Sequence, residues 1–359
     1  MRIGVPKEVK EDENRVALTP AGVTELVASG HEVLIESGAG DGVHIDDERF
    51  KEAGAKIVSG AEDAYIAELV VKVKEPIASE YALVGPGQIL FCFLHLAADR
   101  QLTQALMESG VVAIGYETVE TDDGRLPLLA PMSEVAGRMA TQAGTRFLET
   151  PQGGRGVLLG GVAGVPPAKV TVVGGGIVGA NAALIALGMG ATVTIIDIDV
   201  DRLRHLEEIL IGRVATRMGN KLDIAEASAD SDLVIGAVLT PGAKAPKLIS
   251  EGVVERMRAG TVIVDVAIDQ GGCVETIEPT THSDPVRVVH DVLHYGVTNI
   301  PSAVPNTATH ALTNSTLPWI MEIADHGRLE ACRLHPELRR GLNIVEGEIC
   351  HAGVAAAFG

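Results

Sequence analysis

Short apolar runs recur along the chain and are separated by stretches with helical periodicity. Apolar runs that predict strands in the first third lie at 2–5, 31–36, 69–73, 88–93 and 111–115. Thr19 and Pro20 predict the start of a helix that ends near Gly30, and Asp99 predicts the cap of a helix that runs to Gly110. This alternation of strand and helix predicts a parallel sheet with crossover helices.

The segment from Lys169 to Asp197 contains the strongest local signal. An apolar run stops at Gly174, and the spacing GxGxxG follows before a helical pattern and a second strand that ends in Asp197. Glycines at this spacing let the backbone approach a pyrophosphate, which lies at the start of the helix. A membrane helix is the competing interpretation, because 170–196 carries no charge, but six glycines interrupt that run. A dinucleotide site is therefore favoured.

The carboxylate of Asp197 indicates which dinucleotide binds. An acidic side chain at the end of the second strand accepts hydrogen bonds from the adenosine ribose and repels a 2′-phosphate. This favours NAD over NADP, while the nearby Arg202 keeps a phosphate-binding role open.

Changes in composition predict the domain limits. From Pro127 the chain becomes rich in small residues, with Ser133 as a predicted helix cap, and a glycine-rich segment then leads into the fingerprint. Further strands are predicted at 232–238 and 261–267, and a helix at 307–327. We expect an α/β protein with two Rossmann-like domains, a dinucleotide-binding domain at 128–305 and a discontinuous substrate domain at 1–127 and 306–359.

Charge and cysteine content narrow the class of function. A formal net charge of -19 argues against nucleic acid, which is bound through clustered Lys and Arg. The four cysteines, Cys92, Cys273, Cys332 and Cys350, form no CxxC pair, so neither a zinc site nor a disulfide framework is indicated. The first residues carry no apolar signal-peptide region, which predicts a cytoplasmic enzyme.

Four residues follow predicted strands, where ligands bind in open α/β sheets. Lys74, His95 and Asp269 come directly after apolar runs, and Arg15 lies in the charged loop after the first strand. Two cations, one base and one carboxylate suit the oxidation of an amine or alcohol beside a carboxylate. Structural roles compete: a surface ion pair for Arg15, a strand-end side chain for Lys74, a hydrogen-bond donor for His95 and a turn cap for Asp269.

Glu322 and His326 are spaced like a metal-binding pair on a helix. Four residues separate them, and an ordinary i,i+4 surface contact explains that spacing equally well. No metal site is predicted.

Several long segments together resemble L-alanine dehydrogenase. These segments are RVALTPAG at 15–22, VVKVKEP at 70–76, FLHLAADR at 93–100, LLAPMSEVAGRMA at 128–140, QGGRGVLLGGV at 152–162 and VDVAIDQGGCVETIEPTTH at 264–282. They span nearly the whole chain, so the chain is identified as a member of that family. The resemblance implies reversible, NAD-linked oxidative deamination of L-alanine to pyruvate and ammonium by a homohexamer.

The resemblance also assigns roles to residues. Arg15 and Lys74 match substrate-binding positions, and His95 and Asp269 match the two catalytic positions. An imidazole, with an ordinary pKa of about 6.5, exchanges protons near neutral pH. The fingerprint and the resemblance together predict a cofactor site made of Ser133, Gly174, Gly176, Ile177, Val178, Gly179, Asp197, Arg202, Val238, Leu239, Ala267, Ile268, Asp269, Asn299 and Ile300.

Some positions depart from the family pattern and leave a second interpretation to test. Cys92, Thr240 and Ile300 stand where the family has Thr, Val and Met. The soluble NAD(H)-binding subunit of proton-translocating transhydrogenase shares the opening segment and the domain plan. Its equivalent of the segment at 93–100 lacks the histidine, so His95 favours the dehydrogenase.

Overall fold

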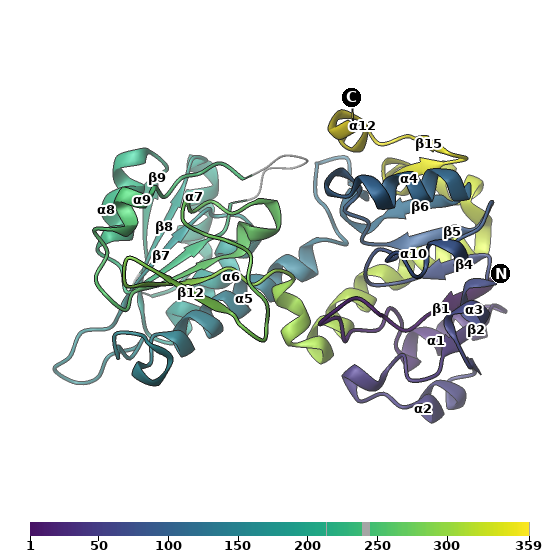
Figure 1. The fold of residues 1–359 in the computed structure, drawn as a ribbon, viewed down its shortest axis with the longest axis horizontal. Coiled ribbons are helices and arrows are strands. Elements are labelled where there is room, and N and C mark those ends of the chain that lie inside the picture. Colours follow the sequence, from purple (N-terminus) through teal and green to yellow (C-terminus); the bar gives the residue numbers. More distant parts are fainter. Residues whose placement is uncertain (213, 239–244, 359) are drawn as a thin grey trace. The chain divides into compact units, whose positions relative to one another are not determined.

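The computed structural model describes residues 1–212, 214–238 and 245–358 and divides the chain into two compact units (Figure 1). The first unit contains residues 1–132 and 302–359, and the second contains 133–301. The divisions fall a few residues from those expected at 127 and 305. A single helix, α5 (Ala130–Phe147), runs across the first division, so no break in secondary structure marks it.

The first unit is built on an eight-stranded, mainly parallel sheet. Its strands lie in the order β15-β14-β6-β5-β4-β1-β2-β3, and only β14 and β15 run antiparallel to their neighbours. They are β1 (Arg2–Val5), β2 (Glu32–Glu36), β3 (Lys56–Val58), β4 (Leu69–Val71), β5 (Ile89–Cys92), β6 (Val112–Gly115), β14 (Leu342–Val345) and β15 (Glu348–Ile349). The part from β3 to β6 has the doubly wound order 3-2-1-4-5-6, whose switch point lies between β1 and β4.

Helices of the first unit begin where the sequence predicts them. Thr19 caps α1 (Pro20–Ala28), and Asp99 caps α4 (Arg100–Ser109), which ends at Gly110 in a left-handed conformation. The other helices are α2 (Asp47–Glu52), α3 (Ala61–Tyr65), α10 (Pro305–Leu334), α11 (Pro336–Arg340), α12 (Ala352–Phe358) and the short 3₁₀ turns η1 (Asp41–Val43), η2 (Tyr81–Leu83), η3 (Leu96–Ala98) and η4 (Tyr116–Thr118). These capping residues fix the helix starts locally, because each side-chain oxygen accepts a free backbone N–H.

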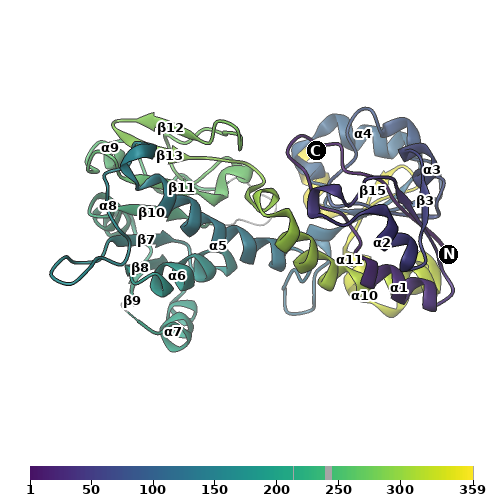
Figure 2. The ribbon, with the colours of Figure 1, turned by 90° about the horizontal axis from the view of Figure 1, so that it is seen from below.

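The helix α10 brings the last part of the chain back to the first unit, where it packs against α1 and η1 (Figure 2). The predicted helix at 307–327 is confirmed but continues to Leu334. Gly327 has φ 68° and ψ 166°, which are not helical, so two helices meet there. The predicted range thus ends at the residue where the two helices meet. Glycine suits this position, because it adopts that conformation without strain.

The second unit is a seven-stranded sheet in the order β12-β13-β11-β10-β7-β8-β9, parallel except for β12. The strands are β7 (Lys169–Val173), β8 (Thr192–Asp197), β9 (Val214–Met218), β10 (Leu233–Gly236), β11 (Val262–Asp265), β12 (Val286–Val289) and β13 (Val292–Tyr295). The helices are α5, α6 (Ile177–Gly188), α7 (Val200–Ile209), α8 (Lys221–Ala229), α9 (Glu251–Val254), η5 (Thr150–Gln152), η6 (Val266–Gln270) and η7 (Ile300–Ala303). The same doubly wound order recurs, with its switch point between β7 and β10. The predicted α/β fold class is confirmed.

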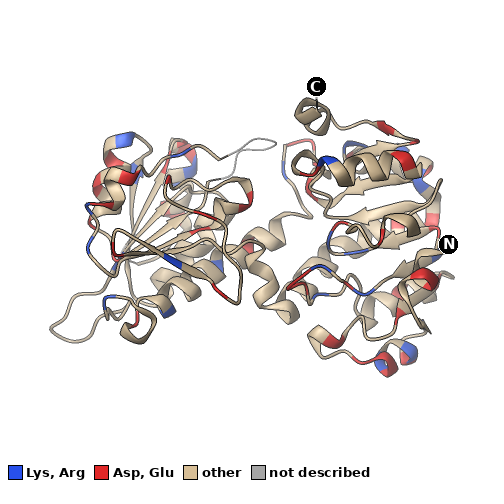
Figure 3. Ribbon diagram, in the orientation of Figure 1, with Lys and Arg blue, Asp and Glu red and all other residues tan. Residues whose placement is uncertain are grey.

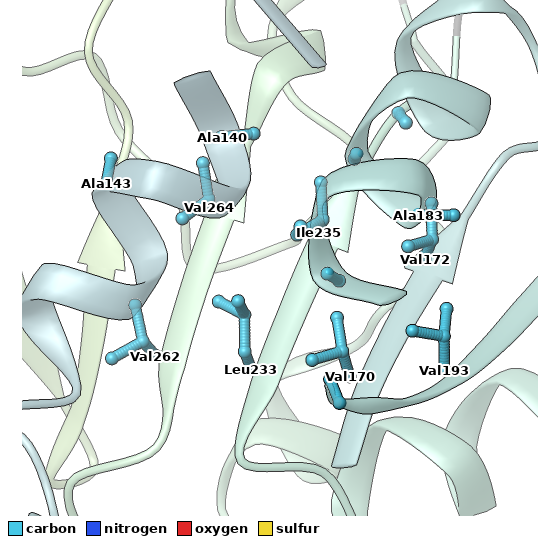
Figure 4. Packing of buried hydrophobic residues seen from close by; sticks show 14 of the residues in the cluster. Ala140, Ala143, Val170, Val172, Ala183, Val193, Leu233, Ile235, Val262 and Val264 are labelled. Atoms are coloured by element: carbon cyan, nitrogen blue, oxygen red, sulfur yellow. The ribbon is translucent and has the colours of Figure 1, made fainter. Parts of the chain in front are cut away.

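Side chains from β7, β8, β10 and β11 form the core beneath α5 and α6 (Figure 4). Val170, Leu233 and Val262 are completely buried there, and each contributes about 1.5–3 kcal/mol by burial. Gly144 of α5 lies so close to Leu233 that a Cβ atom would come within 2.5 Å of Leu233 Cδ1. The absence of a side chain at Gly144 therefore lets α5 pack closely against the sheet.

One local prediction about α5 is wrong. Ser133 was expected to cap this helix, but the helix begins at Ala130, so Ser133 lies in its first turns. A turn at 127–129 starts the helix earlier than the serine signal suggests.

Charged side chains are distributed over helices and loops of both units, with acidic residues in excess (Figure 3). Among the described residues, no helix has the length and apolar character needed to span a membrane. The uncharged run at 170–196 forms β7, α6 and β8 instead, so the membrane interpretation is wrong.

Candidate active site

The fingerprint glycines form the turn between β7 and α6. Gly174 has φ +103°, and a Cβ atom on it would lie 2.6 Å from the carbonyl oxygen of Ala237. A Cβ atom on Gly179 would overlap the carbonyl oxygen of Gly174. Each glycine is therefore required by a close backbone approach, and the turn has the shape that a pyrophosphate needs.

The first turn of α6 offers backbone N–H groups to a ligand. Gly176 precedes this helix of 12 residues and supplies no side-chain cap, and both Gly176 and Ile177 are exposed, while Val178 is half-buried. Without a capping side chain, the N–H groups of the first turn are available for an anion.

Asp197 and Arg202 hold the glycine turn from the neighbouring strand. Asp197 lies at the end of β8 and accepts hydrogen bonds from the backbone N–H of Gly175 (2.5 Å) and of Asp199 (2.9 Å). Arg202 Nε donates to the carbonyl oxygen of Gly175 at 2.5 Å. Asp197, which the sequence assigns to the ribose, and Arg202, for which it leaves a phosphate-binding role open, thus both also hydrogen-bond to the glycine turn.

The next part of the predicted cofactor site lies at the ends of β10 and β11. Val238 follows β10 and is half-buried, and Leu239 lies outside the described residues, as does Thr240. Ala267 and Ile268 are buried in η6 and pack in the core of this unit. Their side chains are structural, which leaves their backbone as the part that a cofactor could contact.

Asp269 is exposed in η6 and is linked to the segment after β13. Its Oδ1 accepts a hydrogen bond from the backbone N–H of Asn299 at 3.3 Å, and Asn299 has a left-handed conformation with φ 54°. The side chain of Ile300 is only 2% exposed and belongs to the core cluster. The structure therefore brings Asp269 and Asn299 together and places the side chain of Ile300 away from solvent.

Sequence reasoning missed Asp265, which shapes the turn that carries Asp269. This completely buried carboxylate accepts hydrogen bonds from the backbone N–H groups of Ala267 (3.0 Å), Cys273 (2.7 Å) and Val274 (3.0 Å). Burial raises the pKa of Asp265 by more than these hydrogen bonds lower it. An aspartate that ends an apolar strand just before a glycine-rich turn was the signal available in the sequence.

In the first unit, Arg15 is buried and paired with Glu13. Its backbone N–H (3.0 Å) and Nε (2.7 Å) both donate to Glu13 Oε1, one terminal nitrogen pairs with Glu13 Oε2, and the other contacts Met132 Sδ at 3.0 Å. The residue is 2% exposed, so the surface ion-pair interpretation is wrong. A guanidinium fixed in this way presents a rigid plane.

His95 and Glu75 come together from the loops after β5 and β4. His95 Nδ1 lies 3.1 Å from Glu75 Oε2, and the backbone N–H of His95 donates to Glu117 Oε1 at 2.7 Å. The ring stacks on Phe93 with a centroid distance of 5.9 Å. Lys74 is half-buried beside Glu75, and its charge is one of those that lower the pKa of Glu75.

A buried ionic cluster beneath these residues was also missed. Lys72 Nζ contacts Glu80 Oε1 at 2.8 Å and Glu8 Oε2 at 3.3 Å, and Tyr65 donates to Glu80 Oε1 at 2.9 Å. Glu8 Oε1 in turn accepts the backbone N–H of Val73 at 2.6 Å. The sequence did contain a signal for this cluster, which is Lys72 within the apolar run at 69–73. A lysine in a buried strand needs carboxylates to pair with.

Glu322 and His326 form the ordinary helical contact. Their Oε2 and Nε2 atoms are 3.6 Å apart, and His335 Nε2 lies 2.8 Å from the same oxygen. Within the described part of the chain, one group of three side chains is close enough together to bind a metal ion. It consists of the exposed residues Glu251, Glu255 and His290 and does not include Glu322 or His326.

Comparisons with known proteins identify the family. Residues 4–136 match the N-terminal domain and residues 140–352 the C-terminal domain of the alanine dehydrogenase/PNT family. The alanine dehydrogenase of Mycobacterium tuberculosis is 56% identical over 360 residues, which cover 100% of this chain and 97% of that protein. The chain belongs to the alanine dehydrogenase family. It is an enzyme, and the C-terminal domain that it shares with this family implies that it binds a dinucleotide.

Solved structures separate the two branches of the family. An L-alanine dehydrogenase structure superposes with a TM-score of 0.96 at 53% identity and covers 100% of this chain and 99% of that chain. A transhydrogenase from Sinorhizobium meliloti has a TM-score of 0.82 at 23% identity, with 98% of this chain and 99% of that chain covered. The second likeness shows a shared fold alone, so the chain falls in the alanine dehydrogenase branch.

Proposed function

We propose that this chain catalyses the reversible oxidative deamination of L-alanine to pyruvate and ammonium, with NAD as the hydride acceptor. The proposal is supported by membership of the alanine dehydrogenase family and by the positions of Lys74 and His95, which follow the neighbouring strands β4 and β5 and both interact with Glu75. The alternative, a transhydrogenase subunit, is disfavoured by the lower identity to that structure and by the presence of His95.

Arg15 and Lys74 bind the substrate in this proposal. The guanidinium of Arg15, fixed by Glu13, suits a planar carboxylate, and Lys74 neutralises the carboxylate and the developing keto oxygen. With the carboxylate held at both positions, Cα has one orientation, which supplies much of the rate gain.

His95 carries the proton. The amine of alanine must be neutral before hydride leaves Cα, and the imidazole takes that proton. Water then adds to iminopyruvate, and His95 moves protons while the carbinolamine collapses and ammonia departs. Asp269 stabilises the cationic imine and orients the water.

The second unit holds the dinucleotide, which when bound accepts the hydride. The fit rests on Gly174 and Gly179, where a side chain would collide with backbone, and on the uncapped start of α6. Gly176, Ile177 and Val178 would hold the pyrophosphate and Asp197 the adenosine ribose. Ser133, Val238, Leu239, Asp269 and Asn299, together with the backbone of Ala267, Ile268 and Ile300, would hold the rest of the dinucleotide. Asp197 supports NAD over NADP, because its carboxylate repels a 2′-phosphate. On the resemblance alone, we propose a homohexamer.

Steady-state rates test this function. With L-alanine, reduction of NAD to NADH should be rapid, and reduction of NADP to NADPH should be much slower. His95→Ala and Asp269→Ala should each lower kcat by at least about 100-fold, since each removes a group that acts on the reacting atoms. Folding of both variants is checked by circular dichroism. A His95→Ala variant that keeps its activity would contradict the proposed mechanism, and absence of alanine-dependent NADH formation by the native chain would contradict the function.

A further inference from the structure

The imidazole of His95 is held by residues on three neighbouring loops of the first unit. Phe93 and Val73 join the loops after β5 and β4 through a backbone hydrogen bond of 3.1 Å, and Glu117 after β6 accepts the backbone N–H of His95. Within the described part of the chain, the ring makes its polar contact at Nδ1, with Glu75. The His95 side chain is 43% exposed.

Glu75 is charged and is itself fixed. Its side chain is only 12% exposed and also pairs with Lys10. Burial raises the pKa of Glu75, but the hydrogen bond and charge of His95 and the charges of Lys74 and Lys10 outweigh it and hold that pKa well below its usual range. Glu75 is therefore ionised throughout the neutral range.

An ionised carboxylate can only accept hydrogen bonds. The contact at 3.1 Å therefore requires the proton of neutral His95 to be on Nδ1. The lone pair is then on Nε2, the opposite nitrogen of the ring. A carboxylate on one nitrogen thus determines which nitrogen can act as the base, and it stabilises the cation formed when that base is protonated.

We propose that Glu75 is a positioning residue that fixes the Nδ1-protonated tautomer of His95 and leaves Nε2 to exchange the proton with substrate. This inference rests on the proposed function of His95 and deepens it. Glu75 acts through His95 and does not touch the substrate. The negative charge of Glu75 also compensates the positive charge that His95 gains during alanine oxidation. Lys74, Lys10 and Glu117 are the other charged groups that face this pair.

The charge of Glu75 predicts a separate effect on kcat and on KM. In Glu75→Gln the amide oxygen still accepts the Nδ1 proton, but the imidazolium that forms during alanine oxidation loses its counter-charge. We expect kcat to fall about 10-fold with little change in KM, because the interaction that is lost acts on the base and not on the bound substrate.

The full-length enzyme with NAD and L-alanine is the test system. Glu75→Asp keeps the charge, so its kcat should fall less than that of Glu75→Gln. Glu48→Gln is the matched control, because it removes an exposed carboxylate of α2 that pairs with Lys51. Its kcat and KM should match the native values. His95→Ala is measured in parallel: if it keeps activity, the proposed function fails, and if it is inactive while Glu75→Gln keeps the native kcat, only the role of Glu75 is overturned.

Two further results decide the matter. A raised KM for alanine with unchanged kcat would place Glu75 with Lys74 in substrate binding and would overturn the positioning role.

The second measurement is NMR spectroscopy of the native protein, so it does not depend on the folding of a Glu75 variant. In native protein labelled with ¹⁵N-histidine, with the His95 signals assigned by their loss in His95→Ala, neutral His95 should show a protonated Nδ1 and an unprotonated Nε2. The reverse pattern would overturn the proposal.

Discussion

At the scale of single residues, the glycines of α6 show how the absence of a side chain creates a binding loop. Gly179 and Gly188 lie in the same helix, but only Gly179 faces the backbone of the preceding turn. A Cβ atom there has no room, because the obstacle is a carbonyl oxygen and not a flexible side chain. At Gly188, apart from its chain neighbours and the nearby backbone of the same helix, no atom lies within 4 Å of the Cβ position.

This difference gives a matched pair of variants. Gly179→Ala should destabilise the protein by about 1–3 kcal/mol and weaken NADH binding at least about 10-fold, because α6 must move away from the Gly174 turn. Gly188→Ala should leave binding unchanged and raise stability by up to about 1 kcal/mol. Chemical denaturation and fluorescence titration with NADH measure both effects. Equal binding by the two variants would mean that the turn tolerates the shift.

At the scale of elements, the end of β4 depends on a buried charge cluster. Lys72 lies between Glu8 and Glu80, and Glu8 also binds the backbone N–H of Val73 immediately before Lys74. Burial raises the pKa of Glu8, and the charge of Lys72 opposes that rise. The positive charge of Lys72 thus partly offsets the cost of burying Glu8 beneath the segment that carries Lys74 and Glu75.

Removing this lysine should be costly. Lys72→Met leaves Glu8 and Glu80 buried without their cation, so we expect a loss of about 3–5 kcal/mol in the free energy of unfolding. Lys51→Met removes an exposed partner of Glu48 and should cost less than about 1 kcal/mol. Urea denaturation compares the two. A similar small loss in both variants would show that Glu8 and Glu80 are neutralised or hydrated when Lys72 is absent.

At the scale of the whole molecule, the chain repeats one topology twice. Both sheets have the order 3-2-1-4-5-6 with an antiparallel addition at one edge, and the candidate site residues follow the central strands of each. The second unit is continuous in sequence, whereas the first is completed only when α10, β14 and β15 return to it. The second unit therefore contains all the strands of its own sheet.

This continuity predicts that a fragment of residues 130–301 folds alone. It keeps α5, all seven strands and the core in which Leu233 and Val262 are buried. We expect cooperative thermal unfolding and NADH binding by this fragment, without alanine oxidation, because Arg15, Lys74 and His95 are absent. Calorimetry and NADH titration test this. An unfolded fragment would show that the core needs the rest of the chain.

Local signals in the sequence were sufficient for most of the architecture. Capping by Thr19 and Asp99, the apolar runs and the GxGxxG spacing each depend on residues close in sequence, so helices, strands and the dinucleotide turn could be predicted. The strand-end rule then selected Lys74, His95 and Asp269 without any knowledge of their contacts. Ser133 was misplaced because a serine is equally compatible with a helix start and with a position inside the first turns.

The sequence by itself determined the fold class, the family and the residues that can carry the chemistry, since these depend on local periodicity and on residue identity. Only the tertiary structure decided the partners of those residues. Glu13 lies two residues from Arg15, but nothing local indicates that both are buried, and 20 residues separate Glu75 from His95. Burial and the pairing of neighbouring strands bring such groups together, because a charge removed from water must find its counter-charge within the folded chain.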